Sequence, residues 1–162
     1  MRSYWLIVIT LLACAALSAA QEGSGELKRV EIFTGYQYAH IYPNANGQGW
    51  NFAMTGNLNR AIGFTGDFSG SYEHGSALYT YMAGPTLSAR TKRVTPFVHA
   101  LFGGGHADGI SAFAMALGGG VDVNAGEHLA LRVIQADWMS FRRAGESINS
   151  NVRASAGIVF RF

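Results

Sequence analysis

The sequence has little cysteine, little proline and almost no excess of charge of either sign. Its 162 residues include one cysteine, Cys14, and three prolines. If residues 1–20 are removed, as argued below, no cysteine remains, which excludes a disulfide and a thiolate metal site. The formal net charge is only +2, so no basic excess points to nucleic acid as a partner.

The chain also has no apolar run long enough for a membrane helix. The longest, at residues 5–16, has about twelve residues and is too short to span a bilayer. It follows Arg2 and precedes the small residues at 18–20, which fit a signal-peptidase site. An amphipathic core helix would need polar side chains every three or four positions, which this run does not supply. We therefore predict a signal peptide over residues 1–20, with cleavage before Gln21.

Cys14 allows a second interpretation of this end of the chain. The residues Leu11-Leu12-Ala13-Cys14 look like a lipoprotein processing box, and Cys14 would then become a lipidated N-terminus. The apolar run continues past Cys14, which favours the cleaved signal peptide. After cleavage, the mostly polar and small residues at 21–29 would form a periplasmic N-terminal arm, and residues 30–162 would form the barrel domain described next.

The main feature of the remaining sequence is alternation of apolar and other side chains, typical of β-strands. We predict eight strands, at 30–40, 49–58, 61–72, 77–88, 94–104, 111–123, 128–139 and 151–162. No segment has the 3.6-residue period of a long amphipathic helix. In the last strand, Ile158, Phe160 and Phe162 share one face, whereas Arg153 and Arg161 share the other.

A strand with arginines on one face cannot be buried on both faces. Apolar side chains against lipid and arginines in a barrel lumen account for both faces at once. Eight strands also match the smallest transmembrane barrels, which must be closed to leave no edge in lipid. The predicted fold is an all-β, eight-stranded antiparallel up-and-down transmembrane β-barrel. The alternative, a water-soluble barrel with inverted faces, would crowd large aromatic side chains into a narrow interior.

The inward positions of these strands predict a charge network in the lumen. Three acidic residues and three arginines fall there, namely Glu31, Asp67, Asp122, Arg132, Arg153 and Arg161. Buried charges persist only when they are paired and hydrogen-bonded, so we expect this balanced set to form ion pairs that fill the lumen.

Two segments leave the choice of face open. In 128–139, continued alternation past Arg132 would place Gln135 and Asp137 against lipid. Either Asp137 lies at the rim, or a bulge near Ile134 resets the alternation. In 94–104, keeping His99 out of lipid favours an inward position for this side chain.

Tyrosine and tryptophan gather near one end of the predicted strands, where we expect an interfacial girdle. Its members are Tyr36, Tyr38, Trp50, Tyr72, Tyr79 and Trp138. The loops at this end are predicted at 41–48, 73–76, 105–110 and 140–150. Arg90, Lys92 and Arg93 fall in a turn at the opposite, periplasmic end, where we expect them to be solvated.

Several short motifs, in their order along the chain, resemble the outer-membrane-protein β-barrel domain family, which is related to OmpA-type eight-stranded domains. They are GYQY at 35–38, GP at 84–85, TPFVH at 95–99, GGGVDV at 118–123, LRVIQAD at 131–137 and the FRF terminus. The terminal Ile158, Phe160 and Phe162 resemble the assembly signal of outer-membrane barrels. The resemblance implies contact with the barrel-assembly machinery, with outer-membrane lipid and with lipopolysaccharide.

The leading functional hypothesis is a monomeric structural or surface protein of the bacterial outer membrane. Its lumen would be plugged by side chains, with no catalytic site, metal or cofactor expected. The short predicted loops offer little area for a large adhesive interface, which usually needs about 800 Å² per partner.

Two other classes of function stay open. A lipid-modifying barrel enzyme would need a nucleophile, a base and an orienting acid within reach of one another. Candidate groups are His74 with Glu73 and Ser76, and His106 with Asp108 and Ser111. Both groups lie in predicted loops, where polar residues are expected in any case. The second alternative is a soluble lipocalin-like binder, to which Gly49-Trp50 bears a faint likeness.

Overall fold

The structure is a computed structural model that describes residues 27–162 except 42–44, 74 and 144–145, and the side chains of 143–150 are not described. The proposed signal peptide, Cys14 and residues 21–26 of the proposed arm lie outside the described residues. The strands are β1 (Val30–Ile41), β2 (Ala45–Asn57), β3 (Ile62–Glu73), β4 (Ser76–Ser88), β5 (Val94–Ala107), β6 (Ile110–Asn124), β7 (Leu129–Arg143) and β8 (Glu146–Arg161). No helix in the described segments is long and apolar enough to cross a membrane.

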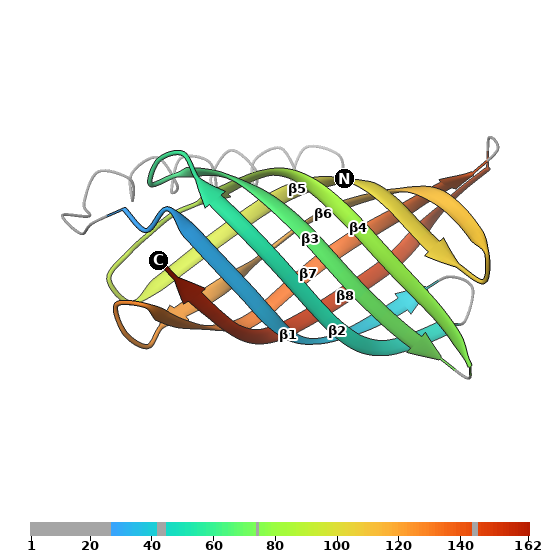
Figure 1. The fold of residues 1–162 in the computed structure, drawn as a ribbon, viewed down its shortest axis with the longest axis horizontal. Coiled ribbons are helices and arrows are strands. Elements are labelled where there is room, and N and C mark those ends of the chain that lie inside the picture. Colours follow the sequence, from blue (N-terminus) through green and yellow to red (C-terminus); the bar gives the residue numbers. More distant parts are fainter. Residues whose placement is uncertain (1–26, 42–44, 74, 144–145) are drawn as a thin grey trace, which may run out of the picture.

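The eight strands close into a single barrel (Figure 1). Each strand pairs antiparallel with the next, and β8 pairs antiparallel with β1, where Glu31 lies opposite Arg161. The backbone amides of Val30 and Phe162 donate to each other's carbonyls at 3.2 and 2.9 Å. Because both ends of the sheet are paired, no strand edge is left to face lipid. The predicted eight-stranded antiparallel up-and-down barrel is confirmed.

The two faces of the barrel differ sharply in polarity. Large apolar side chains are exposed on the outside, among them Met54, Phe52, Phe64, Phe68, Phe102, Phe113 and Phe160. Polar side chains fill much of the inside, and Asn51, Asp67, Gln135, Asp137 and Arg153 are each at most 1% exposed. A water-soluble protein places apolar side chains inside, so this inverted arrangement is the architecture of a transmembrane β-barrel.

The strands extend further toward the loop end than the alternation predicts. The predicted loops at 41–48, 73–76, 105–110 and 140–150 are therefore too long, since β5 reaches Ala107 and β8 starts at Glu146. The β5–β6 hairpin closes in two residues, Asp108 and Gly109, with φ of 48° and 77°. Asp-Gly suits such a turn because both positions need positive φ. Beyond the lipid, a hairpin can be wetted on both faces, so alternation fades there although pairing continues.

A bulge in β7 resets which side chains point inward. Val133 and Ile134 are both exposed on the outside, at 58% and 56%. The pairing of β7 with β8 skips between Arg132 and Gln135. The extra residue restores Gln135 and Asp137 to the interior, where both are buried. Of the two alternatives, the bulge near Ile134 is the one present, and Asp137 does not lie at the rim.

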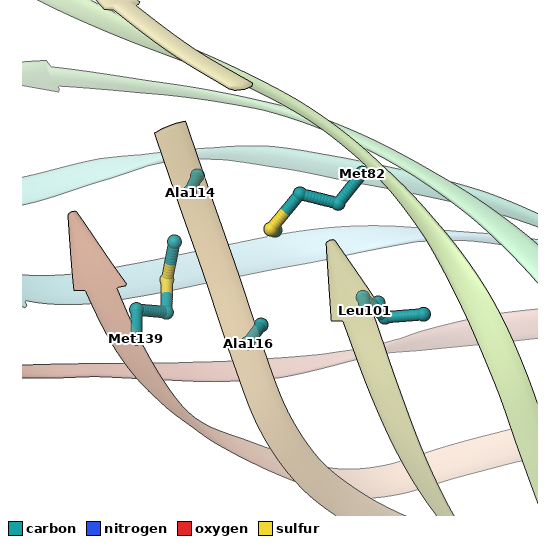
Figure 2. Close-up of a cluster of buried hydrophobic side chains, with 5 residues drawn as sticks. All are labelled: Met82, Leu101, Ala114, Ala116 and Met139. Atoms are coloured by element: carbon teal, nitrogen blue, oxygen red, sulfur yellow. The ribbon is translucent and has the colours of Figure 1, made fainter. Parts of the chain in front are cut away.

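Two apolar clusters complete the interior. In the first, the small side chains of Ala114 and Ala116 on β6 leave room for Met82, Leu101 and Met139 (Figure 2). Phe141 packs against this cluster from β7. The second cluster consists of Phe33, Ala53, Ala130 and Val159. Most of the remaining interior consists of polar and charged side chains, and Phe97 is also buried there.

Candidate functional site

The interior ion pairs centre on Arg153 of β8. Its Nη1 lies 2.7 Å from Oδ1 of Asp67 on β3, and its Nη2 lies 2.6 Å from Oδ2 of Asp137 on β7. A guanidinium group presents several donors in a rigid fork, so it can satisfy two carboxylates at once. Arg153 thereby joins β3, β7 and β8 across the inside of the barrel.

Asp137 is the most heavily bonded carboxylate of the interior. Besides Arg153, it contacts Nε2 of His99 through Oδ1 at 2.7 Å, and Nε2 of Gln135 donates to its Oδ2 at 2.8 Å. Gly118 lies opposite Asp137 on β6, and a Cβ there would be 2.1 Å from Asp137 Oδ1. Glycine is therefore needed at 118 to leave room for the carboxylate. The inward position expected for His99 is confirmed.

Arg132 holds the next part of the network. Its Nε and Nη2 donate to the two carboxylate oxygens of Asp122 at 2.8 and 3.2 Å, and its Nη1 donates to Gln135 at 2.8 Å. Its guanidinium carbon lies 4.3 Å from the ring centroid of Phe33 and 4.2 Å from that of Phe97. The cation thus lies over two aromatic rings, which compensates part of the cost of removing it from water.

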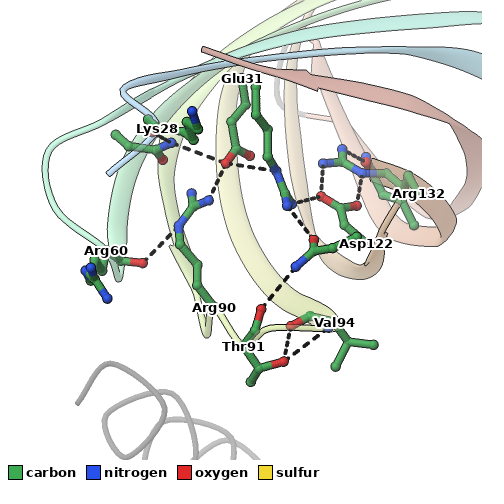
Figure 3. Close-up of polar contacts among 12 residues, drawn as sticks. Lys28, Glu31, Arg60, Arg90, Thr91, Val94, Asp122 and Arg132 are labelled. Atoms are coloured by element: carbon green, nitrogen blue, oxygen red, sulfur yellow. Dashed lines mark hydrogen bonds and ion pairs between the residues drawn. The ribbon is translucent and has the colours of Figure 1, made fainter. Parts of the chain in front are cut away.

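The network continues to Arg161 and Glu31, which lie near the ends of the last and first strands. Figure 3 shows the contacts of Glu31, Arg90, Asp122 and Arg132. Arg161 lies 3.4 Å from both Asp122 and Glu31, and Glu31 also pairs with Arg90. Arg90 Nε donates to the carbonyl oxygen of Arg60 at 3.1 Å, and its side chain is 19% exposed. The prediction of a solvated turn is confirmed for Lys92 and Arg93, which are exposed, and it is wrong for Arg90, because that side chain extends from the turn to the carboxylate of Glu31.

The structure therefore brings the six predicted lumen residues into one connected set. They are Glu31, Asp67, Asp122, Arg132, Arg153 and Arg161, joined through Gln135 and Asp137. Sequence reasoning did not include Asp137, Gln135 and Arg90 in this network. The available signal for Asp137 was the adjacent apolar pair Val133-Ile134, which marks the bulge.

Two small cavities lie beside the network. One of about 20 Å³ is lined by charged residues and threonines, including Asp67, Arg90 and Arg132, and another of about 10 Å³ is lined by Gln37 and Phe141 among others. A single water needs roughly 10–15 Å³, so each has room for about one water molecule. Buried oxygens without a protein partner include Gln37 Oε1, Asn51 Oδ1 and Ser155 Oγ, and bound water would satisfy them.

The six predicted girdle residues all have exposed side chains on the outer surface. Their exposed fractions are 55% for Tyr36, 43% for Tyr38, 44% for Trp50, 45% for Tyr72, 42% for Tyr79 and 39% for Trp138. Five of them lie on β1–β4 and make hydrogen bonds described below, whereas Trp138 lies on β7. At the opposite end, Ile158, Phe160 and Phe162 are exposed on the same outer face of the last residues.

Among the candidate catalytic groups, the structure shows one contact. His106 Nδ1 lies 3.0 Å from Ser111 Oγ, and these two residues face each other across the β5–β6 hairpin. In the described part of the chain, no carboxylate is bonded to His106. His74 lies outside the described residues. The same described residues contain no cluster of three or more His, Cys, Asp or Glu placed to hold a metal ion.

Several solved structures have the same fold. Neisserial surface protein A is similar over 82% of this chain and 96% of its own, at 15% identity and a TM-score of 0.66. Ail, the attachment invasion locus protein of Yersinia pestis, is similar over 82% and 96%, at 16% identity and a TM-score of 0.53. The N-terminal β-barrel domain of Pseudomonas aeruginosa OprF is similar over 83% and 98%, at 9% identity and a TM-score of 0.56.

No protein-family model matches the sequence, and no curated protein matches it either. At 9–16% identity, these structural likenesses show the fold. They place the chain among small eight-stranded transmembrane barrels by architecture. Its activity and partners have to be argued from the geometry of its own residues.

Proposed function

We propose that this chain is a small integral protein of the bacterial outer membrane that acts through its surface and has a lumen plugged by side chains. It would be exported through a cleaved signal peptide and work as a monomer without catalytic activity. A similar structure supports the location, since it is that of the outer membrane protein Ail. The exposed Ile158, Phe160 and Phe162 are then the residues presented to the barrel-assembly machinery.

The observation that carries the plugged lumen is the position of Arg153. Its guanidinium, 1% exposed, connects Asp67 and Asp137 from two other strands. On the loop side, the cluster of Met82, Leu101 and Met139 fills part of the same interior. The two cavities described above have room for about one water molecule each, which supports a lumen closed to hydrated ions.

Planar lipid bilayer recordings on the refolded protein test this closure. We expect no stepwise conductance from the native chain. The variant Asp67→Ala/Asp137→Ala/Arg153→Ala removes the side chains that fill the centre and should produce conductance steps. The matched variant Asp67→Asn/Asp137→Asn/Arg153→Met keeps nearly the same volume without charge and should stay silent.

Each variant must first show the mobility shift between unheated and boiled SDS samples that marks a folded membrane barrel. Steady conductance steps from the native protein would contradict a plugged lumen. So would steps of equal size in the native chain and the alanine variant.

A further inference from the structure

A row of hydrogen-bonded aromatic and amide side chains lies on the outer surface of β1–β4, near the loop end. We call it the aromatic arc, and it consists of Tyr36, Tyr38, Asn46, Gln48, Trp50, Tyr72 and Tyr79. The phenol of Tyr36 donates to Gln48 Oε1 at 2.7 Å, and that of Tyr38 donates to Asn46 Oδ1 at 3.0 Å. Trp50 Nε1 donates to the Tyr72 phenol at 3.2 Å, which in turn donates to Tyr79 at 3.4 Å.

These contacts hold the rings in fixed positions while leaving them exposed. The rings of Tyr72 and Tyr79 meet edge to face, with centroids 6.0 Å apart and planes at 85°. Gly70 provides the space beneath, because a Cβ there would lie 2.8 Å from Trp50 Nε1 and 3.2 Å from the Tyr72 oxygen. The arc is therefore pre-organised, which lowers the entropic cost of binding a partner.

The chemistry of the arc fits a saccharide better than an anion. None of its seven residues carries a formal charge at neutral pH, and His40 adjoins the arc, with its Nδ1 2.7 Å from Asn46 Oδ1. Recognition of phosphate or sulfate normally uses arginine or lysine. Sugar rings present C–H groups that stack on aromatic faces and hydroxyl groups that bond to amide and phenol oxygens, and the arc offers both kinds of group side by side.

The position of the arc indicates where that saccharide comes from. On the same strands, the outer surface continues toward the other end through exposed Phe52, Met54, Phe64 and Phe68. That surface is the lipid-contacting face of the transmembrane barrel, so the arc is continuous with it. A molecule with sugars against the arc and acyl chains against the phenylalanines is a glycolipid of the outer leaflet.

We infer that the aromatic arc binds the uncharged sugars in the headgroup of an outer-leaflet glycolipid. The arc lies on β1–β4, and the described outward side chains in the loop half of β5, β6, β7 and β8 include Phe102, Phe113, Trp138 and Val152. The glycolipid would therefore be held on β1–β4. The lipid source rests on the proposed outer-membrane location, whereas the sugar chemistry rests on the arc alone.

Saturation-transfer NMR on the refolded protein tests this with a defined probe, a neutral hexose oligosaccharide of the lipopolysaccharide outer core, which has no phosphate, carboxylate or acyl group. We expect saturable transfer to sugar C–H protons in the native chain. The variant Trp50→Leu/Tyr72→Leu should weaken binding by about tenfold or more, as loss of aromatic anchors does in other interfaces. Trp138→Leu is the matched control outside the arc and should change affinity less than about twofold.

Three outcomes would overturn the inference. The folded native protein could fail to bind the neutral sugar, it could bind only a phosphorylated form of it, or Trp138→Leu could weaken binding as much as the arc variant. Membrane fractionation of cells separates this test from the proposed function. A protein found outside the outer membrane that still binds the sugar through the arc would refute the location and the lipid source, while the sugar-binding arc stands.

Discussion

The guanidinium of Arg153 lies 2.7 Å from the carboxylate of Asp67, although 86 residues separate them in the sequence. The contact spans from β8 to β3 and exists because the sheet closes on itself. Both side chains are 1% exposed, so water solvates neither charge to a significant extent. In such a site, the loss of one partner leaves the other charge buried without compensation.

Replacing Arg153 with methionine is therefore expected to destabilise the barrel strongly. Asp67 would lose its arginine and Asp137 would keep only His99 and Gln135. We expect the free energy of unfolding to fall by about 3–5 kcal/mol. Urea unfolding in detergent micelles, followed by tryptophan fluorescence, measures this.

The charge-free variant Asp67→Asn/Asp137→Asn/Arg153→Met separates charge from packing. It leaves no buried charge at this position, so it should be more stable than Arg153→Met alone. A triple variant at least as unstable as the single one would show that the charges do not dominate the cost.

A second prediction concerns Gly118, which makes room for Asp137. A Cβ at this position would lie 2.1 Å from Asp137 Oδ1 and 2.4 Å from the carbonyl oxygen of Ala136. We expect Gly118→Ala to lower the free energy of unfolding by about 1–3 kcal/mol through overpacking. Gly56→Ala is the control, because no atom lies within 4 Å of its added Cβ, and it should be neutral or stabilising by about 0.4–1 kcal/mol. Equal effects of the two substitutions would count against the steric role of Gly118.

Arg90 should contribute a small but measurable stabilisation. It connects the turn after β4 to Glu31 and to the carbonyl of Arg60, and it is partly exposed. Solvent screening limits the loss for Arg90→Ala to about 1 kcal/mol of unfolding free energy. Lys92→Ala in the same turn, where the side chain is exposed, should have no effect. If both variants unfold like the native protein in the same urea titration, the Arg90 contact has no energetic weight.

The alternation of β8 illustrates what could be predicted from the sequence. Each of its inward positions between Arg153 and Arg161 follows from a period of two. Lipid on the outer face requires apolar side chains, whereas the lumen accepts polar ones, so the two kinds alternate along the strand. The same argument locates Glu31, Asp67, Asp122 and Arg132, and it is independent of how distant strands meet.

Other features could not be predicted in this way. The bulge at Val133-Ile134 decides that Asp137 is central, and its occurrence depends on pairing with two neighbouring strands. Partner choice among the charges depends on barrel closure, so no local pattern pairs Asp67 with Arg153. Arg90 lies in a turn, where no alternation applies and charge attraction to Glu31 decides the direction.

The contact between His106 and Ser111 allows a direct test of the enzymatic alternative. We expect His106→Ala to leave the lipid A of cells producing the protein unchanged, because no described carboxylate orients the imidazole. Mass spectrometry of extracted lipid A, compared with cells lacking the protein, gives the result. A modification present with the native chain and lost with His106→Ala would establish catalysis.

The central claim is a barrel whose apolar side chains face outer-membrane lipid, and SDS gels of isolated outer membranes test it most directly. Unheated and boiled samples of the native protein and of a variant lacking Phe162 would be compared. The account predicts that the native protein is found in the outer membrane and stays folded in cold SDS. It should change mobility on boiling, and deletion of Phe162 should reduce the folded band. A protein recovered in the soluble periplasmic fraction, with no change on boiling, would contradict the account.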